Sequence, residues 1–122
     1  MTKKRVLVVD DDSDMREAMA HILSAAGYAV ELAADGDEAI ARQRAHPAEV
    51  LITDVFMPSR DGLETIQYFH AEFPDVAIIA MTGGSPTGRS EDYLKVAAIA
   101  GAKATLRKPF SAQALLDNLS AL

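Results

Sequence analysis

Four apolar runs of the sequence end in side chains that can bind a metal or a phosphoryl group. Asp10 and Asp11 follow the first run, Asp54 the second, Thr82 the third and Lys108 the fourth. Carboxylates are the ligands that hard cations such as Mg²⁺ prefer, while a hydroxyl and an ammonium can hold phosphoryl oxygens. Brought together, these side chains would form a site for a metal ion and a phosphoryl group.

The elements that must position these side chains alternate between strand and helix. Apolar, β-rich runs predict five strands, at about Arg5–Val9, Ala29–Leu32, Glu49–Thr53, Val76–Met81 and Ala104–Leu106. Helical periodicity predicts five helices, at about 14–26, 35–45, 62–73, 90–100 and 112–119. Such βαβ units form a parallel sheet, whose ligands bind outside the carboxyl ends of the strands. We therefore expect all the polar strand ends to meet at one edge.

Short polar residues mark where several of the helices begin. Asp12 or Ser13 is expected to cap the first helix, and Asp35 has capping-box spacing to Glu38 at the second. Asp61 and Ser111 are the expected caps of the third and fifth helices, and glycines 27 and 101 are expected stops.

Composition narrows the class of protein. The chain has 122 residues, of which 49% are hydrophobic, so we expect one globular domain over residues 1–122. A formal charge of −6 without a basic cluster argues against direct nucleic-acid binding, and the absence of cysteine excludes thiol chemistry. Val6–Val9 is too short for a signal-peptide core, and no stretch approaches transmembrane length. We expect a cytoplasmic protein that does not bind membranes.

Together, these motifs closely resemble the receiver domain of two-component response regulators, from Val6 to Leu119. The matching residues are Asp10-Asp11, Asp54 with Met57-Pro58 and Asp61-Gly62 behind it, Thr82, and Lys108-Pro109-Phe110. The resemblance implies an α/β three-layer sandwich with five helices. Its five-stranded parallel sheet would have the flavodoxin-like order 2-1-3-4-5.

The resemblance also implies a role for each site residue. Asp54 would accept a phosphoryl group from a phosphohistidine. Asp11, Asp54 and the backbone carbonyl of Phe56 would bind Mg²⁺ directly, and Asp10 would act mainly through a metal-bound water. Mg²⁺ would offset the repulsion between the attacking carboxylate and the phosphoryl anion.

Two further roles follow from the resemblance. Thr82 would donate its hydroxyl to a phosphoryl oxygen. Lys108 would pair with Asp54 and then with the phosphoryl group, and the Lys108–Pro109 peptide would be cis. Such a domain is a phosphoacceptor in a phosphorelay and not an enzyme in the ordinary sense.

The phosphohistidine is expected to belong to another protein. His21, His46 and His70 do not follow a strand toward the acidic edge, so we interpret them as surface residues. The implied partners are a histidine kinase or histidine phosphotransfer protein, and a downstream protein target.

The sequence departs from the usual receiver pattern at three places. Thr105 stands where most receivers carry an aromatic switch residue, and the stretch between Thr82 and Lys108 is a few residues longer than usual, in the loop 83–88. Phe56 adds an apolar ring near the mouth of the site. We therefore predict that the switch lies in the loop after Thr82 and in the helix that follows it.

Two other functions remain open at this stage. A haloacid-dehalogenase-like phosphatase also uses an Asp nucleophile, and Asp10 and Asp12 have the spacing of its first motif. That family needs another acidic pair after its Lys, whereas only Asp117 follows Lys108 here. The other alternative is a degenerate receiver that is never phosphorylated and acts by protein contact alone. In either case, the domain could stand alone or belong to a larger protein.

Overall fold

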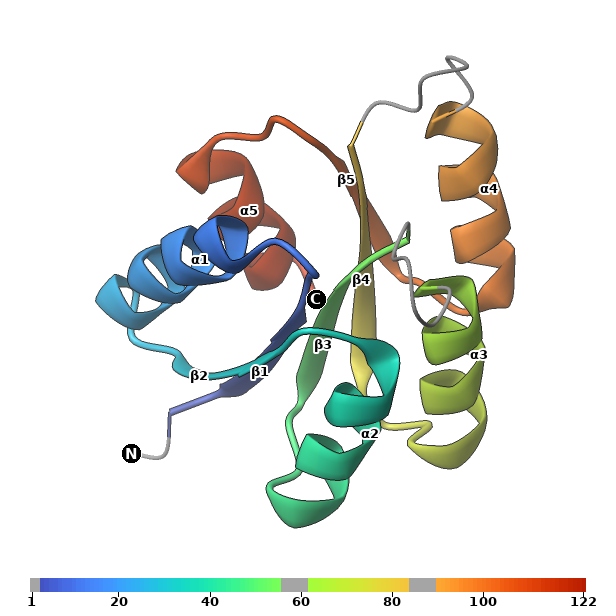
Figure 1. Cartoon of the computed structure of the whole chain (residues 1–122). Helices are drawn as coiled ribbons and strands as arrows, with labels where there is room; N and C mark the ends of the chain where they lie inside the picture. The colour runs from blue at the N-terminus through green and yellow to red at the C-terminus, as the bar shows by residue number, and fades with distance from the viewer. Residues whose placement is uncertain (1–2, 56–61, 84–89) are drawn as a thin grey trace.

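The computed structural model of the protein describes residues 3–55, 62–83 and 90–122. Strands and helices alternate along these residues (Figure 1). The elements are β1 Arg5–Val9, α1 Ser13–Ala25, β2 Ala29–Ala33, α2 Gly36–Ala45, β3 Val50–Asp54, α3 Gly62–Glu72, β4 Ala77–Thr82, α4 Ser90–Ala100, β5 Ala104–Arg107 and α5 Ala112–Ser120. Among the described helices, none is long and apolar enough to cross a membrane.

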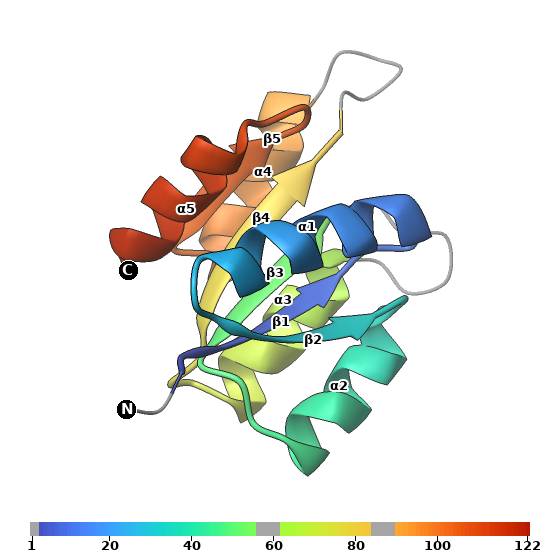
Figure 2. The same cartoon turned by 90° about the vertical axis from the view of Figure 1, so that its left-hand side faces the viewer.

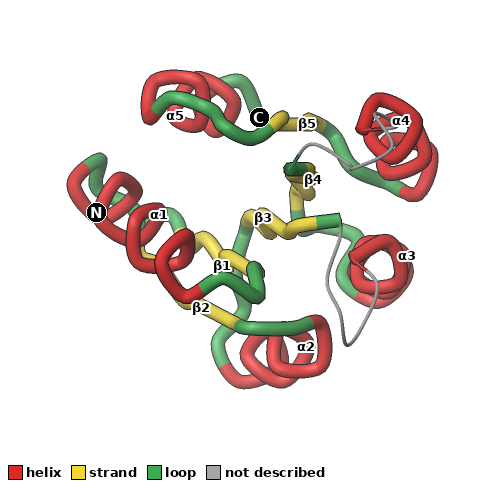
Figure 3. The backbone as a smooth tube through the Cα atoms, turned by 45° about the horizontal axis from the view of Figure 1, so that its top comes forward, coloured by secondary structure: helices red, strands yellow, loops and turns green. Residues whose placement is uncertain are grey.

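The strands form one parallel sheet in the order β2-β1-β3-β4-β5. Helices α1 and α5 lie on one face of this sheet, toward the viewer in Figure 2, and α2, α3 and α4 lie on the other face (Figure 3). The predicted three-layer α/β sandwich and strand order are therefore confirmed for the described residues.

Alternation along the central strands divides the core in two. In β1, Val6 and Val8 pack with Met19 and Leu115 beneath α1 and α5. Their neighbours in sequence pack on the opposite side, where Phe69 of α3 is fully buried. Successive side chains point to opposite faces of a strand, so a strand covered on both faces must be apolar throughout.

Most strand and helix ends differ from the predictions by one residue. Asp54 and Thr82 were expected just after their strands, but each is the last residue of its strand. Both still pair within the sheet, Asp54 with Met81 and Thr82 with Arg107. Pairing with a neighbouring strand extends each of these strands by one residue. The local sequence does not show which strand will lie alongside.

Three of the predicted caps are in place. Asp12 caps α1, which therefore begins at Ser13, and accepts a hydrogen bond from the amide of Asp14 at 3.0 Å. Asp35 caps α2 through the amide of Glu38, at 2.8 Å, and Ser111 caps α5. The expected cap Asp61 lies outside the described residues.

Two glycines allow close approaches between elements. A Cβ on Gly62 would lie 2.0 Å from the carbonyl oxygen of Asp54, so the start of α3 packs directly against the end of β3. Gly101 ends α4 with a φ of +134°, and a Cβ there would lie 2.7 Å from the imidazole of His70 on α3. Any side chain at either position would collide with its neighbour.

Candidate functional site

Asp10 lies at the end of β1 and is fully buried. Its amide donates to the carbonyl of Ala33 at 3.2 Å, and its Oδ1 accepts from the amide of Asp12 at 3.0 Å. Its Oδ2 accepts from Lys108 Nζ at 2.6 Å, and its backbone carbonyl accepts from Arg16 Nη1 at 2.7 Å. Every polar group of Asp10 therefore has a partner within the protein, as a buried carboxylate requires.

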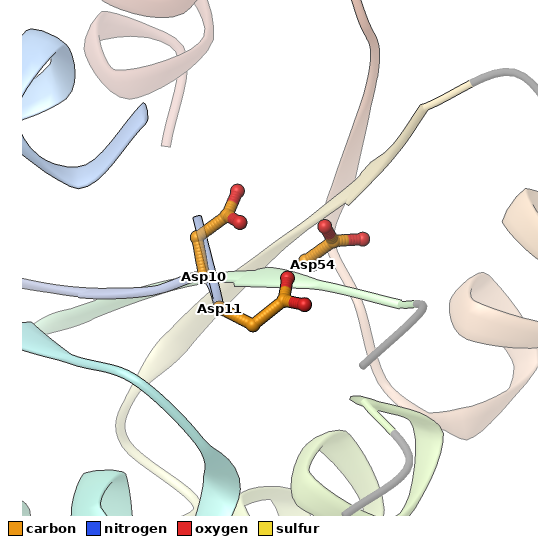
Figure 4. Close-up of side chains that lie close together, drawn as sticks. All are labelled: Asp10, Asp11 and Asp54. Carbon is orange, nitrogen blue, oxygen red and sulfur yellow. The ribbon is translucent and has the colours of Figure 1, made fainter. Parts of the chain in front are cut away.

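The carboxylates of Asp10, Asp11 and Asp54 converge beyond the ends of β1 and β3 (Figure 4). One oxygen from each lies within 4.8 Å of the others. Asp11 is exposed, whereas Asp54 has only 6% of its surface exposed. Adjacent oxygen ligands with one open side suit Mg²⁺, which takes one or two carboxylates and keeps several waters. The donor set therefore fits a magnesium ion, while the fourth predicted ligand, Phe56, lies outside the described residues.

Lys108 joins two of these carboxylates. Its Nζ lies 2.6 Å from Asp10 Oδ2 and 2.9 Å from Asp54 Oδ2. Burial alone would lower the pKa of Lys108, but the hydrogen bonds to Asp10 and Asp54 and the attraction of their charges together outweigh it, so the pKa is raised above its usual 10.5. The peptide between Lys108 and Pro109 is cis. The ammonium is thus held charged next to the predicted nucleophile.

Thr82 is fully buried at the end of β4. Its hydroxyl donates to the carbonyl of Gly83 at 3.1 Å, and its own carbonyl accepts from the amide of Lys108 at 2.7 Å. A Cβ on Gly83 would lie 3.8 Å from Lys108 Cδ, so the residue after Thr82 lies against the lysine side chain. The ends of β4 and β5 therefore place Thr82 and Lys108 side by side.

Arg16 binds the acidic turn from α1 and is a site residue that no sequence pattern predicts. Its guanidinium reaches back six residues to the carbonyl of Asp10. An arginine near the start of an amphipathic helix is usually a solvated residue, so the local sequence carries no signal for this contact. Only the packing of α1 on the sheet brings the two groups together.

The histidines lie apart from the acidic cluster. His21 and His46 are exposed on α1 and at the end of α2, and His70 is an exposed residue of α3 beside Gly101. Among the described residues, none of the three histidines joins the cluster of possible metal ligands that forms the candidate site. A hollow at the opposite end of the sheet, lined by Gln43 and by residues 47–49 and 72–76, likewise contains none of the predicted site residues.

The site is of the receiver type in both its sheet order and its residues. Acids lie at the ends of β1 and β3, a threonine lies at the end of β4, and a lysine follows β5. The family model described as the response regulator receiver domain matches residues 6–120. The chain therefore belongs to the response regulator receiver domain family and has its function in two-component signalling. This assignment favours the receiver interpretation over the phosphatase-like alternative.

Individual relatives agree with the family. The response regulators named MprA from Mycobacterium avium and from Mycobacterium tuberculosis are each 40% identical to this chain over 119 residues. The match covers 97% of this chain and 50% of theirs, so the chain spans about half the length of these curated relatives.

Solved structures show the same architecture. The chemotaxis response regulator CheY4 of Vibrio cholerae is 33% identical, with a TM-score of 0.87 over 98% of each chain. A CheY-like receiver domain protein from Methanospirillum hungatei is 29% identical, with a TM-score of 0.89 over 98% of this chain and 93% of that one.

Proposed function

We propose that Asp54 is the phosphoacceptor of this receiver domain. The observation that supports this role most directly is that Asp54 lies 2.9 Å from the cation Lys108 and clusters with the carboxylates of Asp10 and Asp11, which could hold a second cation. A nucleophile for phosphoryl transfer needs cations beside it, because both the carboxylate and the phosphoryl group are anionic. Of the three acids, Asp54 is the one that ends the central strand β3.

The donor would be a phosphohistidine on a histidine kinase or a histidine phosphotransfer protein. A carboxylate oxygen of Asp54 attacks phosphorus, the P–N bond breaks, and its electron pair returns to the imidazole nitrogen. The product is an acyl phosphate on Asp54. Lys108, already charged and within reach, remains beside the phosphoryl oxygens.

Mg²⁺ would be held by Asp11, Asp54 and the carbonyl of Phe56, with Asp10 acting through water. When bound, it would neutralise charge on the phosphoryl oxygens. Asp10 suits an indirect role because both of its carboxylate oxygens already accept hydrogen bonds, from Asp12 and Lys108. Asp11 is the exposed member and the natural direct ligand.

Thr82 would carry the signal away from the site. Its hydroxyl now donates to Gly83, and new phosphoryl oxygens on Asp54 would offer it a stronger, charged acceptor. Rotation of the hydroxyl would release Gly83 and allow the following loop and α4 to move. We infer that this loop and α4 form the surface that a downstream protein recognises.

The residues 1–122 would work as one receiver domain in the cytoplasm, either alone or as part of a longer regulator. The formal charge of −6 argues that the domain itself does not contact nucleic acid or an anionic membrane.

The test is incubation with Mg²⁺ and acetyl phosphate, followed by intact mass measurement and site mapping. One added phosphoryl group is expected, absent from Asp54→Asn and in the presence of EDTA. Equal labelling of wild type and Asp54→Asn would refute the assignment. Labelling at Asp10 would instead support the phosphatase-like alternative, and no labelling by either acetyl phosphate or a phosphorylated histidine kinase would support a degenerate receiver.

A further inference from the structure

Arg16 binds the main chain of the acidic turn and not one of its carboxylates. Its Nη1 donates to the carbonyl of Asp10 at 2.7 Å, while its own amide donates to the carbonyl of Asp12 at 3.1 Å. We propose that Arg16 is a positioning residue for the magnesium site, an inference that rests on the proposed function. It would act by fixing the backbone from which Asp11 projects.

The need for such a residue follows from the contacts of Asp11. Its carboxylate is exposed and makes no hydrogen bond or ion pair with the described part of the chain. Its direction is therefore set by the backbone on either side. On the helix side, Asp12 is fixed as the cap of α1, and on the strand side, Asp10 is fixed by Arg16 and Ala33.

Arg16 also lacks the contacts that would make it a charge-neutralising residue. It forms no ion pair with a carboxylate among the described residues, and its one side-chain partner is the neutral carbonyl of Asp10. A positive guanidinium near a cation site repels the cation, so Coulomb's law alone makes Arg16 unfavourable for Mg²⁺ binding. If Arg16 favours Mg²⁺ binding, it must therefore do so through the position that it gives to the backbone of the acidic turn.

The two roles of Arg16 predict opposite signs. If the charge of Arg16 dominates, Arg16→Met will bind Mg²⁺ more tightly than wild type. If positioning dominates, the variant will bind Mg²⁺ more weakly, because the backbone of Asp10–Asp12 is no longer fixed. Groups that orient metal ligands from outside the coordination shell typically change metal affinity by about 10- to 100-fold when removed.

The experiment measures the Mg²⁺ dissociation constant by calorimetry and the melting temperature without metal. Arg16→Met removes the donor, and Arg16→Gln is a second, polar variant with the same loss of charge. Arg42→Met is the matched control, since Arg42 is an arginine of α2 that is paired with Glu31 of β2 and Glu38 of α2. We expect both Arg16 variants to bind Mg²⁺ about 10-fold more weakly and the control to bind it as wild type does.

Mg²⁺ binding by the Arg16 variants that is as tight as in wild type, or tighter, overturns the proposal. A lower melting temperature with an unchanged dissociation constant also overturns it, since Arg16 would then be merely structural. These results differ from a failure of the proposed function, in which wild type itself would bind no Mg²⁺ or be phosphorylated at a residue other than Asp54.

Discussion

The ammonium of Lys108 lies closer to Asp10 than to the predicted phosphoacceptor, at 2.6 Å against 2.9 Å. The side chain of Asp10 is 1% exposed, so this contact is shielded from water on the carboxylate side. Lys108 thus has an anchor, Asp10, that is not itself the acceptor of the phosphoryl group. Its position can persist when Asp54 gains a phosphoryl group.

The first prediction concerns this anchor. Lys108→Met leaves two buried carboxylates without their shared donor, and we expect the free energy of unfolding of the metal-free protein to fall by about 2 kcal/mol. The cost should be smaller in an Asp10→Asn background, because part of the interaction is already gone. Urea denaturation of the four proteins measures this coupling, with the exposed Lys103→Met as the control. Equal costs in the two backgrounds would show that Lys108 and Asp10 are not coupled.

The second prediction concerns alkaline pH. Burial lowers the pKa of Lys108, but its hydrogen bonds to Asp10 and Asp54 and the attraction of their charges together raise it on folding above its usual 10.5. A group whose pKa rises on folding stabilises the protein fully below its unfolded pKa, and this contribution is lost as the pH rises through the folded value. Above pH 10.5, the free energy of unfolding of wild type should therefore fall more steeply than that of Lys108→Met. Parallel curves across this range would contradict the raised pKa.

The third prediction compares two adjacent acids. Asp11→Ala should weaken Mg²⁺ binding and leave the metal-free melting temperature unchanged or higher, since it removes one of three clustered negative charges. Asp12→Ala should lower the metal-free stability by about 1 kcal/mol through loss of the α1 cap, with the smaller effect on Mg²⁺ affinity. Thermal melts with and without Mg²⁺ check both expectations. A metal-free Asp11→Ala protein clearly less stable than wild type would argue against repulsion in the cluster.

The fourth prediction compares two glycines near the site. Gly62→Ala places a Cβ 2.0 Å from the carbonyl of Asp54, so the backbone must shift, and we expect a loss of about 2 kcal/mol or more. At Gly83, the Cβ would make an ordinary contact of 3.8 Å with Lys108, and Gly83→Ala should change the stability little. Chemical denaturation of the two variants measures the difference, and similar stabilities would contradict the packing argument.

The fifth prediction concerns the switch. Phosphorylation adds about −1.5 to −2 charges at Asp54, and Gly83 can change its backbone angles at little steric cost. Thr105 is an exposed residue of β5 without a ring, so it has no aromatic group to turn inward. We expect beryllofluoride, which mimics the phosphoryl group, to shift amide resonances outside the site most strongly over Gly83–Leu94. Shifts that centre on Thr105 and α5 while the loop stays unchanged would show that the switch lies elsewhere.

Much of the fold followed from short-range patterns. The apolar run Val6–Val9 and the caps Asp35 and Ser111 depend on residues that are neighbours in sequence, and the structure confirms all three. The extension of β3 to Asp54 depended on pairing with β4, so it was predicted one residue short.

The candidate site could be predicted as a set of residues but not as a set of contacts. The strand ends indicated which side chains would meet, because parallel strands share one edge. The sharing of Lys108 between Asp10 and Asp54 and the reach of Arg16 to Asp10 depend on how deeply β1 lies in the sheet and how α1 packs on it. Neither quantity is encoded in a local motif.

The contact between Gly101 and His70 sets a geometric limit on how α4 can respond. The carboxyl end of α4 closes on α3 at Gly101, with no room for even a methyl group between the two. The amino end of α4, at Ser90, follows the loop that begins at Gly83. A displacement that starts at Thr82 would therefore tilt α4 about Gly101, and the amino end of the helix would move farthest.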